Sequence, residues 1–285
     1  MYIAHLFIFF ILSCLPKTTA LSNVEKVVDP NIVSQGRNLF EQHILTIGGK
    51  TTIERHQNRI VVGKVRQFEQ MSEWRFISYH TRDHHFMIWL QHPEYGIITK
   101  GYDGSNGWQG TGVNNANPTY ESIDGIELQR LKQQADFFEY LNHIMWFPKI
   151  VAVEEDNFAG RIVKRVQTQN YLNERQDVFF DVENHLLLGS VRFEPLIDPS
   201  KSTQQNEKSQ AQENINYQEV WVRYGHYVQV QDVYMPFSIE YSIDGKNKVV
   251  LLEEAYFDVT SQERDFLFQK YNFAVGNNPF SSPFP

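Results

Sequence analysis

The stretch GYDGSNGWQG, residues 101–110, decides how this chain is organised. Its glycines recur at every third residue: Gly101, Gly104, Gly107 and Gly110. Asp103-Gly104 and Asn106-Gly107 are strong tight-turn signals, because Asp, Asn and Gly tolerate a positive φ. Trp108 is a large apolar residue, so we do not expect it to be exposed in a loop. We therefore expect strands before this stretch and a helical pattern after it.

The chain before the glycines alternates with a period of two, which predicts β-strands. Four such runs occupy residues 59–69, 73–80, 84–91 and 95–102. Their short connectors predict antiparallel hairpins. In the third run, His85, Met87 and Trp89 share one face, whereas the opposite face is also apolar. A sheet with water on one side would not show this pattern, so we expect a cover on each face.

Two helices and a second group of strands complete the expected elements. Ser34–Thr46 has helical spacing and ends at Gly48-Gly49, and residues 121–143 predict one helix that covers the sheet. Residues 114–120 read as a loop. The later strands are expected at 149–155, 161–169, 175–183, 186–194, 217–225, 227–232, 235–244 and 248–259. Residues 195–216 are polar and of low complexity, which predicts a loop insert.

The first twenty residues resemble a secretory signal peptide. The apolar run Leu6–Leu15 is too short to span a bilayer, and Thr18-Thr19-Ala20 offers a cleavage point. An alternative is a lipoprotein-type signal in which Cys14 becomes the lipid anchor. We expect a periplasmic protein. The predicted organisation is a signal peptide (1–20), a linker (21–33), one domain (34–260) and a C-terminal tail (261–285).

Charge and cysteine content narrow the class of function. The formal net charge is −8, and removal of Lys17 with the signal leaves 25 basic and 34 acidic residues, a net charge of −9. No basic stripe is present, so we expect no nucleic-acid partner. Cys14 is the only cysteine, so a chain cleaved after residue 20 has neither disulfides nor a catalytic thiol. An exported protein without disulfides fits a bacterial envelope.

A cluster in the sequence, His80, His84, His85 and His92, raises the hypothesis of a metal or catalytic site. Neighbouring residues of a strand point to opposite faces, so His84 and His85 are not expected to bind one metal ion. The common hydrolase and metalloprotease motifs do not occur in the sequence. We expect no metal, no cofactor and no enzymatic activity, with a hydrolase that uses the His80–His92 region as the less favoured alternative.

A series of motifs resembles the bacterial outer-membrane lipoprotein carrier superfamily, the LolA/LolB-like proteins. A helix ends in Gly48-Gly49, and a strand meander leads to Tyr102-Asp103-Gly104-Ser105-Asn106-Gly107-Trp108. A helix then leads to Phe147-Pro148-Lys149, and a late segment reads Asp232-Val233-Tyr234-Met235-Pro236-Phe237. The resemblance covers residues 36–260. It implies a mainly β (α+β) fold, a strongly curved antiparallel half-barrel of about ten or more strands around a few helices.

The resemblance also implies an apolar cavity for acyl chains under the sheet. Large or flexible apolar side chains in mid-strand are the expected lining, and the candidates are Met87, Trp89, Phe179, Phe193, Trp221 and Phe237. The predicted function is that of a non-enzymatic periplasmic binding protein for a lipid acyl chain or a lipidated protein. The alternative is an interaction module with a filled cavity that contacts an envelope protein partner.

Overall fold

The structure of the protein is a computed structural model. The structure describes residues 29–68, 72–112, 119–137, 139–170, 174–195, 217–243 and 246–273. The signal peptide predicted at 1–20 lies outside these ranges, as does the insert beyond residue 195.

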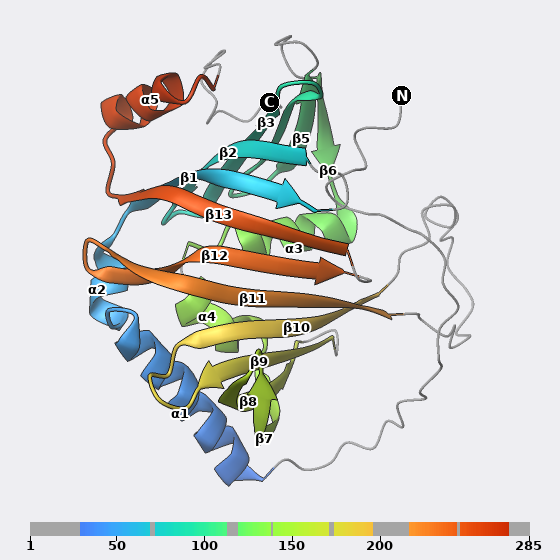
Figure 1. Ribbon diagram of the computed structural model, residues 1–285, viewed down its shortest axis with the longest axis vertical. Coiled ribbons are helices and arrows are strands. Elements are labelled where there is room, and N and C mark those ends of the chain that lie inside the picture. The colour runs from blue at the N-terminus through green and yellow to red at the C-terminus, as the bar shows by residue number, and fades with distance from the viewer. Residues whose placement is uncertain are drawn as a thin grey trace.

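Within the described residues, thirteen strands form one antiparallel sheet (Figure 1). The strands are β1 (Asn58–Gln67), β2 (Ser72–Thr81), β3 (His85–His92), β4 (Gly96–Asp103), β5 (Gly107–Gly112), β6 (Thr119–Ile123), β7 (Lys149–Phe158), β8 (Arg161–Gln169), β9 (Arg175–Asp181), β10 (Leu187–Pro195), β11 (Tyr217–Val230), β12 (Val233–Ile243) and β13 (Lys246–Phe257). The helices are α1 (Pro30–Thr46), α2 (Lys50–Arg55), α3 (Gly125–Gln134), α4 (Glu139–Trp146) and α5 (Ser261–Lys270).

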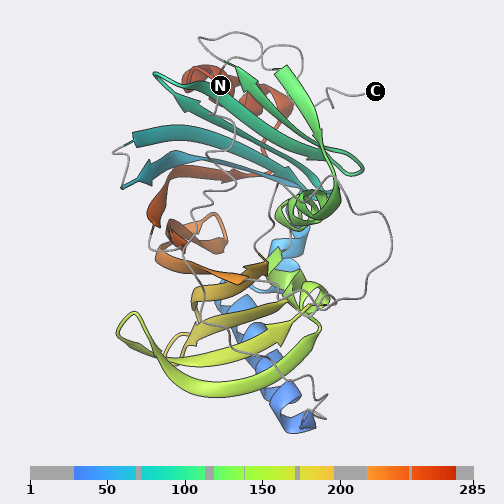
Figure 2. The same cartoon turned by 90° about the vertical axis from the view of Figure 1, so that its right-hand side faces the viewer.

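The strand order is β6-β5-β4-β3-β2-β1-β13-β12-β11-β10-β9-β8-β7. Two meanders, β1–β6 and β7–β13, are therefore joined by the pairing of β1 with β13, and the sheet stays open between β6 and β7. Figure 2 shows the sheet curving around α1, α3 and α4. The predicted fold class, a curved antiparallel half-barrel around a few helices, is confirmed.

The glycine-rich stretch belongs to the sheet more fully than the sequence predicted. Gly104 has a φ of 90° and forms the expected turn, but Gly107 already begins β5, and part of the expected loop forms β6. Side chains occupy the space where a Cβ of Gly107 would lie, with Leu131 at 2.7 Å and Leu128 at 2.9 Å. The glycine thus allows α3 to approach the sheet closely.

The helix predicted at 121–143 is wrong as a single element. Ile123 ends β6, α3 covers Gly125–Gln134, and α4 begins at Glu139. Between the helices lies Asp136, which is buried. Its carboxylate accepts hydrogen bonds from Trp146 Nε1 at 2.7 Å and Asn142 Nδ2 at 3.1 Å. These bonds hold the connection against α4, which periodicity alone did not reveal.

Two boundaries also differ from the sequence prediction. Helix α1 begins at Pro30, inside the predicted linker, because the Asp29 carboxylate caps it by accepting from the Asn31 N–H at 2.9 Å. The expected strands 217–225 and 227–232 form the single strand β11, because the pairing with β12 continues in the same register on both sides of His226, whose φ is 50°. A local irregularity, and not a turn, separates the two runs.

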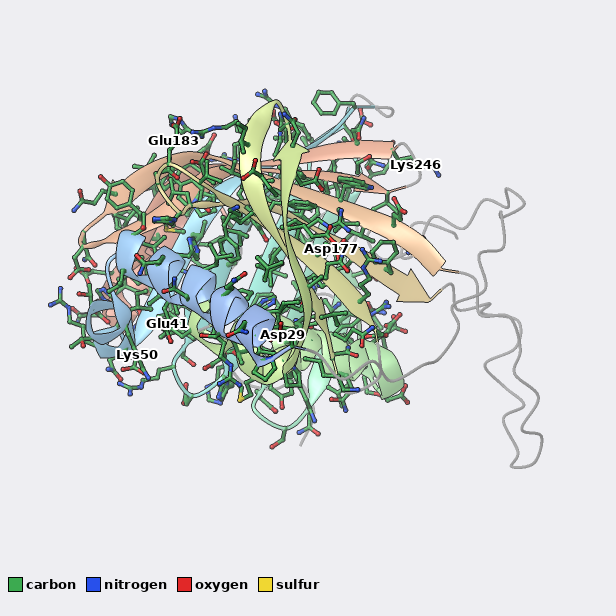
Figure 3. All side chains as sticks on the ribbon, turned by 90° about the horizontal axis from the view of Figure 1, so that it is seen from below. Asp29, Glu41, Lys50, Asp177, Glu183 and Lys246 are labelled. Carbon is green, nitrogen blue, oxygen red and sulfur yellow. The ribbon has the colours of Figure 1, made fainter. Side chains whose placement is uncertain are left out.

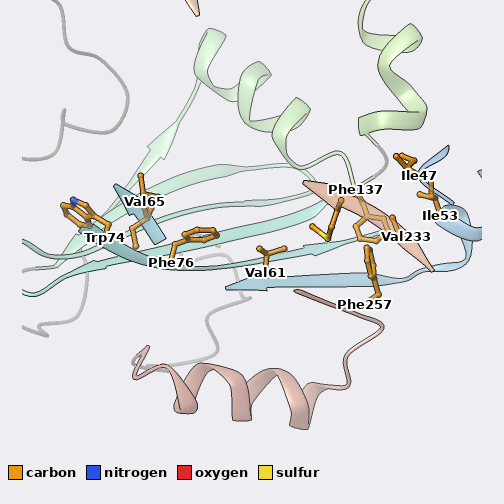
Figure 4. Packing of buried hydrophobic residues seen from close by; sticks show 11 residues of the cluster. Ile47, Ile53, Val61, Val65, Trp74, Phe76, Phe137, Val233 and Phe257 are labelled. Carbon is orange, nitrogen blue, oxygen red and sulfur yellow. The ribbon is translucent and has the colours of Figure 1, made fainter. Parts of the chain in front are cut away.

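Helix α5 lies within the segment 261–285 predicted as the C-terminal tail, where the sequence prediction included no helix. The sequence does contain its start signal, a capping box in which Glu263 N–H donates to Thr260 Oγ1 and Thr260 N–H donates to Glu263 Oε2. The helix packs Leu267 and Phe268 on the outer face of β1–β5. In Figure 4, α5 lies on the opposite side of the strands from α3 and α4. Each face of this part of the sheet is covered, as the two-sided apolar strand predicted.

An ion pair between Glu254 and Lys270 links α5 to β13 and predicts a pH dependence. Burial alone would raise the pKa of Glu254, but hydrogen bonds from Lys270 Nζ at 2.9 Å and Tyr256 hydroxyl at 2.6 Å lower that pKa to about 2. A folded-state pKa below the unfolded value stabilises the fold above about pH 4.3. This contribution is lost as the pH falls towards 2.

We therefore expect Glu254→Gln to reduce the acid sensitivity of folding. Wild type should lose more free energy of unfolding between pH 5 and pH 2.5 than the variant, as measured by urea unfolding at each pH. Both partners are partly exposed, so the difference should shrink in 1 M salt. Parallel curves for the two proteins would contradict the assignment.

Candidate ligand-binding face

The concave face of the sheet carries a continuous apolar surface beneath the helices. Its buried members come from α1–α2, the α3–α4 connection and both meanders of the sheet (Figure 4). They are Ile47, Ile53, Val61, Val65, Trp74, Phe76, Leu90, Phe137, Val233, Met235 and Phe257. Helix α1 extends this surface to the other end of the sheet and lies beside the β7–β8 hairpin (Figure 3). There Phe40 meets Phe180 edge to face, with ring centres 5.0 Å apart.

A second group of apolar side chains packs against this cluster but stays partly exposed to solvent. Its members are Ile44, Ile88, Ile98, Leu141, Leu186, Tyr227, Val230, Phe237, Val250, Leu252 and Ala255. They include neighbours on β12 and β13 and one residue on α4, so the partial exposure is shared by sheet and helix. Apolar surface that still contacts water gains free energy when a ligand covers it.

The convex face of the central strands has a different character. Lys64 lies 3.3 Å from Glu73 and 3.2 Å from Glu253, and Arg223 pairs with Glu240. These pairs are solvated and contribute little stability. The two faces therefore differ in chemistry: the inner face can take an apolar ligand, whereas the central outer face is suited to water.

A few polar side chains interrupt the apolar inner surface near α1 and α4. His43 is buried, and burial lowers its pKa to about 4 despite the hydrogen bond with the His185 carbonyl. Burial lowers the pKa of His143 to about 3, assisted by the positive charge of Arg192. Both imidazoles are consequently neutral at pH 7. His143 stacks on Phe40 with ring centres 4.5 Å apart.

His56 forms a structural clamp at the opposite end of the inner surface. Its Nδ1 lies 2.7 Å from Asp258 and its Nε2 lies 2.8 Å from Asp232, which also pairs with Arg55. The clamp ties α2 to the β11–β12 turn and to the end of β13. Because both ring nitrogens are already bonded, neither is available to accept a proton from a substrate.

The histidines that the sequence singled out do not converge. His80 lies at the end of β2 beside Phe86, while His92 is buried at the far end of β3 between Trp74 and Tyr95. His84 and His85 are exposed at the β2–β3 turn. Within the described ranges, no three His, Cys, Asp or Glu side chains form a group able to hold a metal ion.

The structure distributes the six predicted lining residues over three places. Met87 and Trp89 face α5 on the outer side of β3, where Trp89 Nε1 lies 2.8 Å from Met87 Sδ and the indole meets Phe268 edge to face. They therefore fill the interface with α5 and do not face the concave surface. Both faces of β3 carry apolar residues, so the sequence alone did not show which of these side chains face the inside of the sheet.

Phe179, Phe193 and Trp221 lie on the outer face at the other end of the sheet. Phe179 stacks on Phe158 with ring centres 4.4 Å apart, and Phe193 packs against the same cluster. Trp221 is 43% exposed and lies parallel to Phe158 at 6.3 Å. Of the six residues, Phe237 is the one that packs against the concave cluster.

Comparison with known proteins shows the fold. No protein-family model matches the chain, and no curated protein matches its sequence. Among solved structures, a DUF1329 family protein from Desulfovibrio piger is 9% identical with a TM-score of 0.52, over 81% of this chain and 96% of that chain. A LolA superfamily protein from Nitrosomonas europaea is 9% identical with a TM-score of 0.49, over 80% of this chain and 95% of that chain. MucB of Pseudomonas aeruginosa in complex with MucA is 9% identical with a TM-score of 0.23, over 80% of this chain and 96% of that chain.

The likeness to the DUF1329 family protein, at this low identity, shows a shared fold. A LolA superfamily protein is also among the similar structures. The chain thus has the open, curved antiparallel sheet that the resemblance implied. In the part of the chain that the structure describes, no helix is both long and apolar enough to cross a membrane.

Proposed function

We propose that this protein is an exported binding protein of the cell envelope that holds an acyl chain, from a lipid or a lipidated protein, against its concave face. The observation that carries the proposal is the row of partly exposed apolar side chains on β12, β13 and α4, next to a fully buried cluster. Covering them with an acyl chain is worth on the order of 0.8 kcal/mol per buried methylene before entropic losses.

Export is part of the proposal. The apolar run Leu6–Leu15 would direct the chain across the inner membrane, and cleavage after Ala20 would release it. In the alternative, Cys14 anchors the mature protein. The intact mass of the mature N-terminus distinguishes the two forms.

The function is tested first on wild-type protein. Gently purified protein is expected to retain lipid that mass spectrometry detects, and it should bind the neutral apolar probe N-phenyl-1-naphthylamine with a rise in fluorescence. If no lipid co-purifies and the probe does not bind, the acyl-chain proposal fails. The interaction module with a filled interior would then be the better description.

A matched pair of variants on β13 locates the binding surface. Val250 packs against the inner cluster, whereas its neighbour Val249 pairs with Glu240 and Arg66 on the outer face. Val250→Asn is expected to weaken probe binding at least about fivefold, because a polar amide in the binding surface must be desolvated. Val249→Asn should leave binding within about twofold of wild type.

A second pair of variants, on α4, tests the same surface from the helix side. Leu141 packs against the inner cluster, and Met145 on the same helix is 55% exposed. Leu141→Asn should weaken binding of the probe, while Met145→Asn should not. Thermal unfolding of all four variants identifies any that lose binding only because they unfold. Equal binding by the inner and outer variants would place the probe elsewhere.

A further inference from the structure

Arg192 faces the concave side of the sheet. Its neighbours Val191 and Phe193 belong to the outer aromatic cluster, and alternation along β10 directs Arg192 to the opposite face. It pairs across the strands with Gln176 on β9 and Val220 on β11. Val178, two residues from Gln176 on β9, packs with α1 on that same inner face.

Among the side chains that the structure describes, the charge of Arg192 has no acidic partner. Its Nε is buried without a hydrogen bond, and no ion pair involves its guanidinium. Asp177 lies on the outer face, where it pairs with Arg165 at 3.3 Å and Arg175 at 2.6 Å. Arg192 is partly buried and its Nε is shielded from water. A guanidinium in this position without a counter-charge is costly, so its presence on an apolar surface calls for a partner that arrives from outside.

Two further polar groups beside Arg192 have unused hydrogen-bonding capacity. Gln176 is 8% exposed, and its Oε1 has no hydrogen-bond partner among the described residues. His143 Nε2 is likewise buried without a partner, and this imidazole is close enough for the Arg192 charge to lower its pKa. An arginine, a neutral imidazole and an amide thus lie at one end of the apolar inner surface, next to Phe40 and Ile144 of the α1 cluster.

We infer that Arg192, with His143 and Gln176 beside it, holds the anionic head group of an amphiphile whose acyl chain lies along the concave face. The inference rests on the proposed function and specifies its ligand as a carboxylate or phosphate monoester with one acyl chain. The guanidinium fork matches two oxygens of either anion and keeps its positive charge at any physiological pH. The Gln176 amide donates through Nε2–H once it turns that group towards the anion, and His143 donates in its Nε2–H tautomer; neither residue adds a charge that would repel the anion.

The test measures displacement of N-phenyl-1-naphthylamine by dodecanoate, dodecyl phosphate and 1-dodecanol, which carry chains of equal length. Wild type should bind at least one of the two anions about tenfold more tightly than the alcohol, the range expected for charged hydrogen bonds. Arg192→Gln should remove this preference and leave dodecanol within about twofold. Arg192→Lys, which keeps the charge but loses the fork, should retain part of it.

The control is Arg223→Gln, on the outer face of neighbouring β11, which should keep the full preference for the anion. Arg59→Gln is a second comparison, because Arg59 also has a buried Nε without a partner but lies over the Phe137 ring at 5.8 Å. Arg192→Gln removes an unpaired charge, so its unfolding temperature should equal or exceed that of wild type. Acetate and inorganic phosphate should not displace the probe.

The outcomes separate the two proposals. If wild type binds dodecanol and both anions with equal affinity, the inference about Arg192 is overturned and acyl-chain binding stands. The inference also fails if Arg192→Gln weakens all three ligands equally, if Arg59→Gln alone removes the preference, or if chain-free anions displace the probe. If neither the probe nor dodecanol binds wild type, the proposed function itself fails.

Discussion

Gly101→Ala is expected to lower the free energy of unfolding by about 3 kcal/mol, the upper part of the range for overpacking a core. Gly101 on β4 pairs directly with Trp108 on β5, whose indole is buried across the glycine. A Cβ at residue 101 would overlap this ring, with further ring atoms at 2.6 and 2.8 Å. The indole must therefore move out of the α5 interface or the two strands must separate.

The matched control is Gly225→Ala on β11. The nearest atom to a Cβ at residue 225 is Ser238 Cβ, at 3.9 Å, and the backbone there is compatible with alanine. This change should be neutral or stabilise the protein by up to about 1 kcal/mol, because alanine restricts the unfolded chain. Urea unfolding compares both variants. Equal effects at the two glycines would show that Trp108 does not lie across residue 101.

Phe268→Ala is expected to cost about 3–5 kcal/mol, the range for removing a buried phenyl ring. Phe268 on α5 is 1% exposed and meets Trp89 edge to face, with ring centres 6.0 Å apart. The cavity left behind would weaken the docking of α5 and expose the Trp89 indole to water. The tryptophan emission should therefore shift to longer wavelength together with the loss of stability.

Phe266 provides the control on the same helix. It is 63% exposed, so Phe266→Ala should change the free energy of unfolding by less than about 0.5 kcal/mol. Because α5 covers the convex face, Phe268→Ala should also retain probe binding at temperatures where the variant is folded. Loss of binding in a folded Phe268→Ala variant would place the ligand under α5, near Met87 and Trp89, and would contradict a concave site.

Local patterns predicted much of the fold because they reflect local physics. Period-two alternation predicted the eight strands that lie between residues 59 and 102 and between residues 149 and 194. Helix α1 ends just before Gly48-Gly49, as expected. The misses have local causes as well. Glycine-rich β5 lacks the side chains that signal a strand, and the start of α5 was signalled only by the short capping box at Thr260.

The candidate site was much less predictable than the fold. The sequence favoured large aromatic side chains, whereas the surface that carries the proposal is built mainly from ordinary aliphatic residues such as Val250 and Leu252. One feature of the sequence could have pointed to Arg192: it is a single charged residue between Val191 and Phe193 in a predicted strand. That pattern shows that Arg192 faces away from the other two, but it does not show which face holds water.

The sequence by itself determined an antiparallel β protein with apolar residues on both faces of its first strands, because alternation and turn chemistry act between near neighbours. Only the tertiary structure decided that β1 pairs with β13, that α5 covers the outer face, and that Arg192 lies on the inner face with its Nε unbonded among the described residues. These features depend on contacts between residues far apart in the chain. A strand that is apolar on both sides is symmetric in its own pattern, so its inner face is fixed only when the helices pack against it.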